Sequence, residues 1–179
     1  MRTSTQRRLA AVPLVAGLGA LSIVGAPPTA ASATPVSITV EAGTLSISAP
    51  TVMVDLGTVS TAEQTVISGS LGSVEVVDER NAATDAQWVA SVVATDFATS
   101  SGGVIPAAAI DYRVGYISHS GSGTFTALDP SGLATTSPVV RGADLAGPNS
   151  ASWSPTITVA VPSESMAGTY TASITHSVS

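Results

Sequence analysis

Two histidines, His119 and His176, are the side chains of this sequence best suited to act as a general base near neutral pH, and there is no cysteine. A hydrolytic triad needs a base that an acid orients beside a nucleophile. Serines occur throughout the chain, so no spacing singles out such a set. Zinc needs three or four ligands, which two distant histidines without cysteine do not supply. We therefore expect no catalytic residues, no cofactor and no metal, with His119 in a surface loop and His176 in the last strand.

The carboxylates give a weaker signal. Glycosidases use a pair of carboxyl groups, and no spacing among the twelve acidic residues marks one pair. Asp78, Glu79, Asn81 and Asp85 fall in one connection, where their oxygens suit calcium, but the regular spacing of a calcium loop is absent. We interpret this connection as a turn in which Arg80 pairs with an aspartate, and calcium stays open as the alternative.

Aromatic side chains bear on sugar binding, because carbohydrate-binding sandwiches expose planar rings for stacking. Trp88 lies in an apolar run and is expected in the core. Trp153, between two serines at the start of an expected strand, suits either the core or a ligand. Tyr112 and Tyr116 flank Arg113 and would form a small polar-aromatic patch. The candidate ligand contacts are therefore Trp153, Tyr112, Tyr116 and Arg113.

Short runs in which apolar residues alternate with Ser and Thr dominate the rest of the chain. A period of two places one set of side chains toward a core and the other toward solvent. Gly, Pro, Asn and Asp cluster between the runs, which is typical of a sandwich or barrel. We expect an all-β fold, an antiparallel β-sandwich of immunoglobulin-like type. The clearest alternating runs are residues 36–40, 45–49, 74–76, 157–161 and 170–178.

Two segments are harder to assign. Residues 84–99 lack Gly and Pro, and their valines fit both helical spacing and alternation. Because β-branched residues are frequent there, we favour a strand over a helix. Residues 129–155 are rich in Pro, Thr and Ser, and we expect them to form a long irregular connection.

The first 33 residues have the pattern of a signal peptide. Three arginines precede an uncharged apolar run over residues 9–26, and Ala31-Ser32-Ala33 fits a signal peptidase site. A membrane anchor is the alternative, although the run contains three glycines and is near the lower length limit for a span. We expect a cleaved signal peptide, residues 1–33, and a single secreted domain, residues 34–179, without a membrane span.

The charge of the expected mature chain limits its partners. Three arginines stand against twelve acidic residues, a net charge of −9, and there is no lysine. Binding to phosphates requires clustered basic residues, so nucleic acid is excluded as a partner. Without cysteine there is no disulfide and no lipid attached to a thiol, so the fold depends on its hydrophobic core.

Several motifs follow one another in a particular order: Leu71–Arg80, Trp88, Asp96-Phe97, Ile105-Pro106-Ala107, and a closing stretch with Pro162 and the run Ala167–Val178. This order resembles the WxL-domain surface proteins of Gram-positive bacteria, particularly shorter relatives among actinobacterial secreted proteins. The resemblance covers residues 69–179 and implies a WxL-like all-β domain held non-covalently at the cell wall, where WxL domains are associated with peptidoglycan. The first Trp-x-Leu motif falls on Trp88-Val89-Ala90 and keeps only its tryptophan, and the second falls on His176-Ser177-Val178 and keeps neither residue.

Together these observations lead to three hypotheses. The first is a non-enzymatic, secreted cell-surface module that associates non-covalently with a cell-wall polymer or with another surface protein. The second is a carbohydrate-active accessory protein or weak hydrolase that uses His119. The third is a structural subunit that docks through the edge of a strand.

The position of cleavage is directly testable. Ala31 and Ala33 fit the small subsites of signal peptidase, so N-terminal sequencing of the exported protein should begin at Thr34. An exported protein that still carries Arg2 would contradict this prediction.

Overall fold

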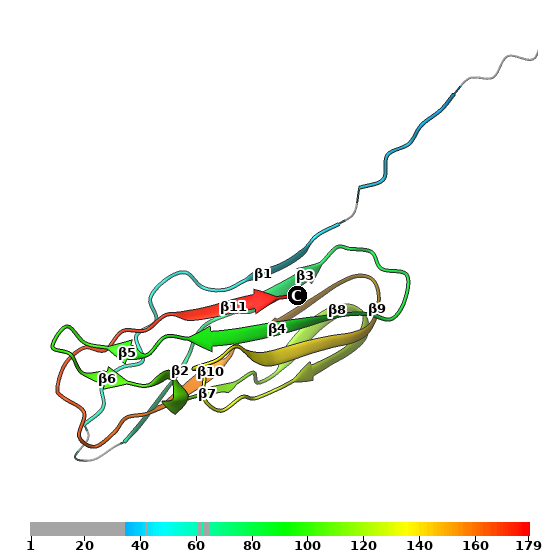
Figure 1. The fold of residues 1–179 in the computed structure, drawn as a ribbon. Helices are drawn as coiled ribbons and strands as arrows, with labels where there is room; N and C mark the ends of the chain where they lie inside the picture. The colour runs from blue at the N-terminus through cyan, green and yellow to red at the C-terminus, as the bar shows by residue number, and fades with distance from the viewer. Residues whose placement is uncertain (1–34, 42, 61, 63–64) are drawn as a thin grey trace, which may run out of the picture. The chain divides into compact units, whose positions relative to one another are not determined.

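The computed structural model describes residues 35–41, 43–60, 62 and 65–179, so the expected signal peptide lies outside the described residues. From Val40 onward the chain forms one unit that is nearly all strand, with a single 3-10 turn, η1, and no α-helix among the described residues (Figure 1). The predicted all-β class is therefore confirmed. The elements are β1 (Leu45–Ser48), β2 (Val66–Ser70), β3 (Val74–Asp78), β4 (Ala86–Ala94), β5 (Phe97–Ala98), β6 (Val104–Ile105), η1 (Ala107–Ala109), β7 (Ile110–Arg113), β8 (Ile117–Ala127), β9 (Ser137–Trp153), β10 (Thr156–Ala160) and β11 (Ile174–Val178).

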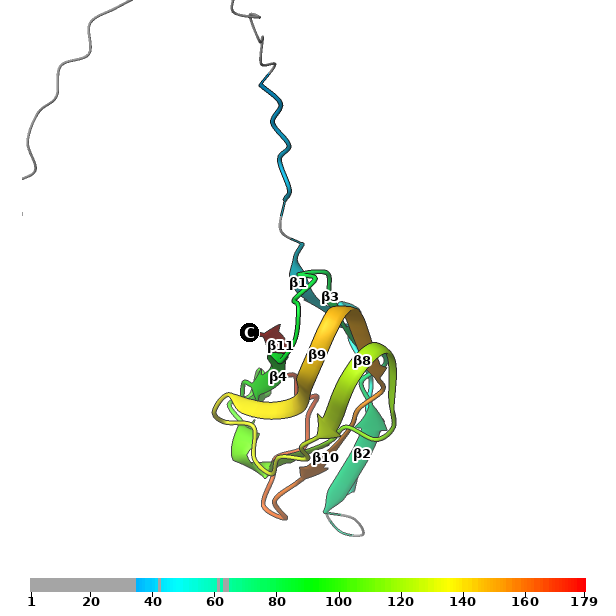
Figure 2. The same cartoon turned by 90° about the vertical axis from the view of Figure 1, so that its right-hand side faces the viewer.

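The strands form antiparallel sheets that close almost completely on themselves, giving a barrel-like sandwich (Figure 2). The largest sheet has the order β1-β3-β9-β4-β11, and β8 also pairs with β9. A second sheet has the order β2-β10-β7, and β5 pairs with β6. At 17 residues, β9 is long enough to pair with both β3 and β4 along one edge and with β8 along the other.

Three pairs of strands continue from the small sheet into the large one at a shared corner. β2 leads into β3, β7 into β8, and β9 into β10, and the pairing register on each side of β9–β10 shifts by one residue across the corner. Gly72 and Gly115 have φ values of +87° and +75° there, in a region that favours glycine. Across the corner the Leu71 N–H donates to the Pro155 carbonyl at 2.9 Å. One backbone hydrogen bond thus links neighbouring chains at the bend between the two sheets.

The core lies between the sheets and follows the period of two that the sequence shows. On β4 every second residue is buried, starting at Trp88, while the residues between them are only partly covered. β3 behaves in the same way, with Val74 and Val76 fully buried. Residues 84–99 therefore supply a strand rather than a helix, and the prediction that Trp88 belongs to the core is confirmed.

A buried polar cluster holds the middle of β9 against the connection between β3 and β4. The Trp88 Nε1–H donates to Asn149 Oδ1 at 3.0 Å, and Asn149 Nδ2 donates to Asp78 Oδ2 at 3.3 Å. Arg80 donates two hydrogen bonds to the same carboxylate, from Nε to Oδ1 and from Nη2 to Oδ2, each at 2.9 Å. The predicted Asp–Arg pair is thus present, but Asp78 is buried rather than solvated. A buried carboxylate is tolerated because its oxygens are hydrogen-bonded.

Four expectations from the sequence were wrong. His119, which was expected in a surface loop, lies on β8. Residues 129–155 are not a long irregular connection, since β9 occupies most of them, and Trp153 ends that strand instead of starting one. Pro138 argued against a strand in this segment, because proline cannot donate a backbone hydrogen bond. In the structure it lies at a register shift, where β9 pairs irregularly with β4. Residues 36–40 alternate as a strand does, yet they belong to no strand in the described chain.

The Asp78 cluster predicts a specific acid sensitivity. Hydrogen bonds from Arg80 hold the pKa of Asp78 below its usual value of 3.8. The cluster therefore stabilises the folded state fully above that pH, and its contribution is lost as the pH falls through the lower pKa of the folded protein. Replacing Asp78 with alanine should cost about 1–3 kcal/mol at neutral pH, because Asn149 and Arg80 lose their acceptor.

Urea unfolding of wild type and D78A between about pH 6 and pH 2 measures this effect. The stability difference should shrink toward the acid end. Glu75→Ala, which removes an exposed carboxylate from the same strand, is the matched control. A difference between D78A and wild type that does not change with pH would contradict the assignment.

Candidate functional site

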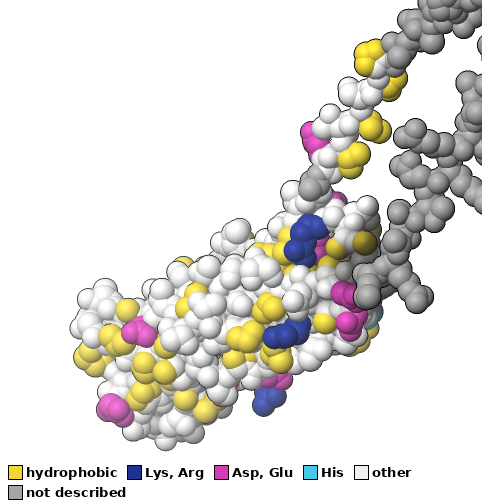
Figure 3. All heavy atoms as spheres, turned by 45° about the vertical axis from the view of Figure 1, so that its right-hand side comes forward, with side chains coloured by type: hydrophobic (Ala, Val, Ile, Leu, Met, Phe, Trp, Pro, Cys, Tyr) yellow, Lys and Arg dark blue, Asp and Glu magenta, His cyan; other side chains and the backbone are white. Residues whose placement is uncertain are grey.

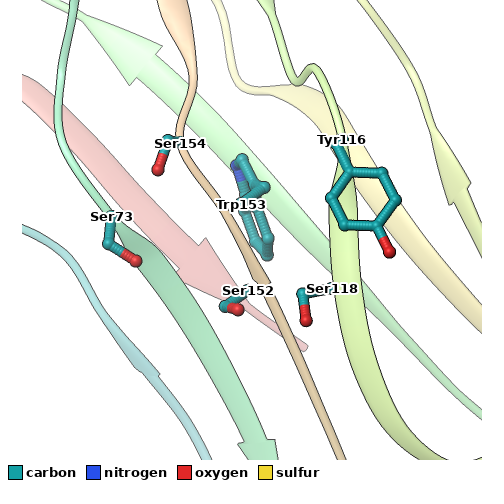
Figure 4. Close-up of a pocket in the computed structure, with 6 residues that line it drawn as sticks. All are labelled: Ser73, Tyr116, Ser118, Ser152, Trp153 and Ser154. Carbon is teal, nitrogen blue, oxygen red and sulfur yellow. The ribbon is translucent and has the colours of Figure 1, made fainter.

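A depression of about 340 Å³ opens at the corner where the strands pass between the sheets. The lining comes from three neighbouring chain segments, because the residues directly before β3 and β8 lie beside the end of β9. Figure 4 shows Trp153 between Ser73 on one side and Tyr116 on the other. The lining consists of two aromatic rings and four hydroxyls: Ser73, Tyr116, Ser118, Ser152, Trp153 and Ser154.

The two aromatic residues play different parts in the depression. Tyr116 is 86% exposed and presents its ring to solvent. Trp153 is buried and forms part of the floor, with its indole N–H already occupied. A planar ligand can therefore stack on Tyr116, whereas Trp153 offers only the small part of its ring that reaches the surface.

Behind Trp153 a chain of hydrogen bonds runs into the core. Its Nε1–H donates to Tyr112 Oη at 3.0 Å, and that hydroxyl lies 3.1 Å from His176 Nε2 on β11. Burial raises the pKa of Tyr112 to about 12 and lowers the pKa of His176, so both are neutral near pH 7. An indole can only donate, so the Tyr112 hydroxyl accepts from Trp153 and its own proton is free for the imidazole. These hydrogen bonds fix the orientation of the Trp153 ring, which forms part of the floor of the depression.

The structure brings together only part of the predicted contact set. Tyr116 and Trp153 meet in the depression, but Tyr112 is fully buried and takes no part in a surface patch. Arg113 is exposed, forms an ion pair with Asp129 at 3.5 Å, and is not among the lining residues. Of the four expected contacts, Tyr116 and Trp153 therefore line the depression, and Tyr112 supports Trp153 from within the core.

Beside the depression lies a surface covered with serine hydroxyls, which the sequence alone did not indicate as a site. Side chains opposite one another in a ladder point to the same face of the sheet. In one row Ser48 lies beside Glu75, then Ser152, then Ser118; in the next, Ser46 lies beside Val77, then Ser150, then Ser120. We call the six serines of these rows, Ser46, Ser48, Ser118, Ser120, Ser150 and Ser152, the serine face.

The serine face contains one acidic side chain and no basic one in these two rows. Ser120 Oγ and Ser150 Oγ lie 2.8 Å apart, so hydroxyls of neighbouring strands are within hydrogen-bonding distance. Only Ser46 and Ser48 lie in a run whose alternation was recognised in the sequence; the other four serines were assigned to a loop and to an irregular connection. That they lie abreast on four strands depends on the register, which the alternation alone does not give.

The other candidate residues lie apart from this surface. His119 is exposed and stacks on the Phe125 ring, with 4.6 Å between ring centroids. Within the described residues neither histidine forms an ion pair with a carboxylate. In the same part of the chain no group of three or more His, Cys, Asp or Glu side chains is placed to hold a metal, and Asp78 of the proposed calcium connection faces Arg80.

Comparison with protein-family models, curated proteins and solved structures found no match to this chain. Among the residues that the structure describes, no helix has the length and apolar character needed to cross a membrane.

The hydrogen-bond chain behind the depression can be tested by removing one oxygen. Tyr112→Phe leaves the buried Trp153 N–H and the His176 ring without their partner. Stability should fall by about 1–3 kcal/mol, the cost of an unsatisfied buried polar group. Tyr116→Phe removes the same atom from an exposed ring and should leave stability unchanged. Equal urea midpoints for the two variants would show that the buried chain contributes nothing.

Proposed function

We propose that this chain is a secreted, non-enzymatic cell-surface module that binds a neutral wall glycan non-covalently. The observation that carries the proposal is the depression at the corner, where the exposed Tyr116 ring lies beside the hydroxyls of Ser118 and Ser152. The resemblance to WxL domains and the predicted signal peptide are consistent with a location at the cell surface. The binding surface is the depression together with the serine face.

The chemistry of this surface suits a sugar polymer. A sugar ring presents C–H groups on its faces and hydroxyls around its rim. An aromatic ring contacts the C–H groups, and a serine hydroxyl can both donate hydrogen bonds to the sugar hydroxyls and accept them. The depression is shallow, so a single sugar unit would be held weakly. A long polymer that also crosses the serine face would gain from repeated contacts.

Charge favours a neutral polymer over an anionic one. Glu75 lies in the serine face, and the chain as a whole is acidic, with a net charge of −6 before any processing. Figure 3 shows a surface on which charged side chains are few and scattered among uncharged ones. A phosphate-rich wall polymer would be repelled by this charge, whereas an uncharged glycan would not.

Co-sedimentation with insoluble wall glycan freed of its anionic polymers tests the proposal. Tyr116→Ala should weaken binding about five- to tenfold, since one aromatic contact is worth about 1 kcal/mol. Tyr116→Phe keeps the ring and should bind as wild type does, and Tyr170→Phe is a control remote from the depression. Binding of Y116A that equals wild type would rule out the depression as the site, and no binding by wild type would contradict the proposed function itself.

A further inference from the structure

β11 is an outer strand of the large sheet, and its contribution to the core is small. Ile174, His176 and Val178 are half-buried, and the two residues between them are exposed. The buried core residues of the described chain all precede this strand. Figure 1 shows β11 alongside β4, with which it pairs over its whole length. β11 is therefore held mainly by this ladder and by three half-buried side chains.

One hydrogen bond joins β11 to the opposite side of the core. Tyr112, a fully buried residue of β7, has its Oη 3.1 Å from Nε2 of His176. The centroids of the two rings are 5.8 Å apart. Because β7 belongs to the small sheet and β11 to the large one, this contact ties the two sheets together. We call Trp153, Tyr112 and His176 the latch.

The direction of the hydrogen bonds in the latch requires a neutral imidazole. Trp153 donates to the Tyr112 hydroxyl, so the phenol proton is directed at His176 Nε2, which must hold a lone pair. The ring proton of the neutral imidazole then lies on Nδ1. An imidazolium carries a proton on both nitrogens, so it can only donate to the Tyr112 oxygen, and the phenol proton then loses its acceptor. Protonation therefore removes a hydrogen bond and leaves a cation half-buried.

No charged group faces His176 to compensate for that cation. Among the described residues, β1 and β4 lie beside β11 and contain neither a charged nor a titratable residue. On β7 the titratable group that faces His176 is Tyr112, while Asp111 and Arg113 alternate with it and are exposed. Trp153 at the end of β9 does not titrate. Burial therefore acts alone, and it lowers the pKa of His176 below its usual value of 6.5.

We propose that protonation of His176 releases β11, so that this strand opens in mild acid while the rest of the domain stays folded. Opening of an outer strand needs only the loss of its own ladder and contacts, which costs less than global unfolding. In the opened strand the imidazole is solvated and takes up a proton at its ordinary pKa. The attachment of β11 is therefore complete above pH 6.5 and weakens as the pH falls through this value.

Release of β11 would change two parts of the domain. Ala90, Val92 and Ala94 of β4 are buried and lie opposite β11, so opening uncovers both a sheet edge and apolar surface. An uncovered edge can accept a strand from another molecule. The Tyr112 hydroxyl also loses its acceptor, so the hydrogen bonds that orient Trp153 are weakened. The latch thus makes both features sensitive to acid.

Amide hydrogen exchange of the exported protein, measured residue by residue by NMR, tests the release. Protection of β11 amides is compared with protection of β3 amides at about pH 7.5 and about pH 5, after correction for intrinsic exchange. In wild type the opening of β11 relative to β3 should increase at least about fivefold at the lower pH. The Asp78 cluster does not contribute, since its carboxyl titrates below pH 3.8.

Two substitutions separate the latch from other effects of acid. His176→Gln offers the Tyr112 hydroxyl an acceptor that does not titrate, so the relative opening of β11 in H176Q should be the same at both pH values. His119→Gln removes the other histidine, which is exposed and stacks on Phe125, and H119Q should behave as wild type does. Equal pH dependence in wild type and H176Q would overturn the proposal.

A second measurement uses wild type alone and does not depend on the folding of H176Q. Nitrogen chemical shifts of the His176 ring should place the proton on Nδ1 at about pH 7.5, and β11 should open over the pH range in which this ring titrates. A proton on Nε2 at neutral pH, or β3 and β11 amides that open together in acid, would show that the latch does not exist. These measurements contain no wall polymer, so their result does not depend on whether the depression binds a glycan.

Discussion

The passage of β9 into β10 is the constraint on which most of this structure depends. Both strands have hydrogen-bonded neighbours along both edges, so the three strand links must bend at the same place. Buried backbone groups that lost their partners at the bend would be costly. Gly72, Gly115 and Pro155 lie at this bend, and the depression opens at the same corner.

Two buried polar clusters tie other elements to this path. Each contains a tryptophan whose indole N–H finds an acceptor: Trp88 donates to Asn149, and Trp153 donates to Tyr112. A buried polar group is satisfied only in one arrangement of its neighbours, so such clusters favour a single packing over alternatives of similar apolar burial. In a chain without disulfides this selectivity supplements the core. It also links the floor of the depression to β11 through His176.

The surface of the domain carries little charge around the depression and the serine face, where Glu75 is the one charged side chain in the two serine rows. The depression and the serine face offer hydroxyls and one exposed ring, and these are the groups on which we base the proposed contacts with an uncharged polymer.

The sequence by itself determined the fold class, the strand identity of residues 84–99 and the burial of Trp88, because alternation is a local property of each strand. It also indicated Tyr116 and Trp153 as candidate contacts from residue type. It did not reveal β9, because its prolines and glycines resemble a loop until neighbouring strands are in place. Gly142, for example, leaves room for the Trp88 ring, which a Cβ atom would meet at 2.8 Å. Which serines lie abreast and why Tyr112 is buried were decided only by the tertiary structure, since each depends on pairing between residues far apart in the chain.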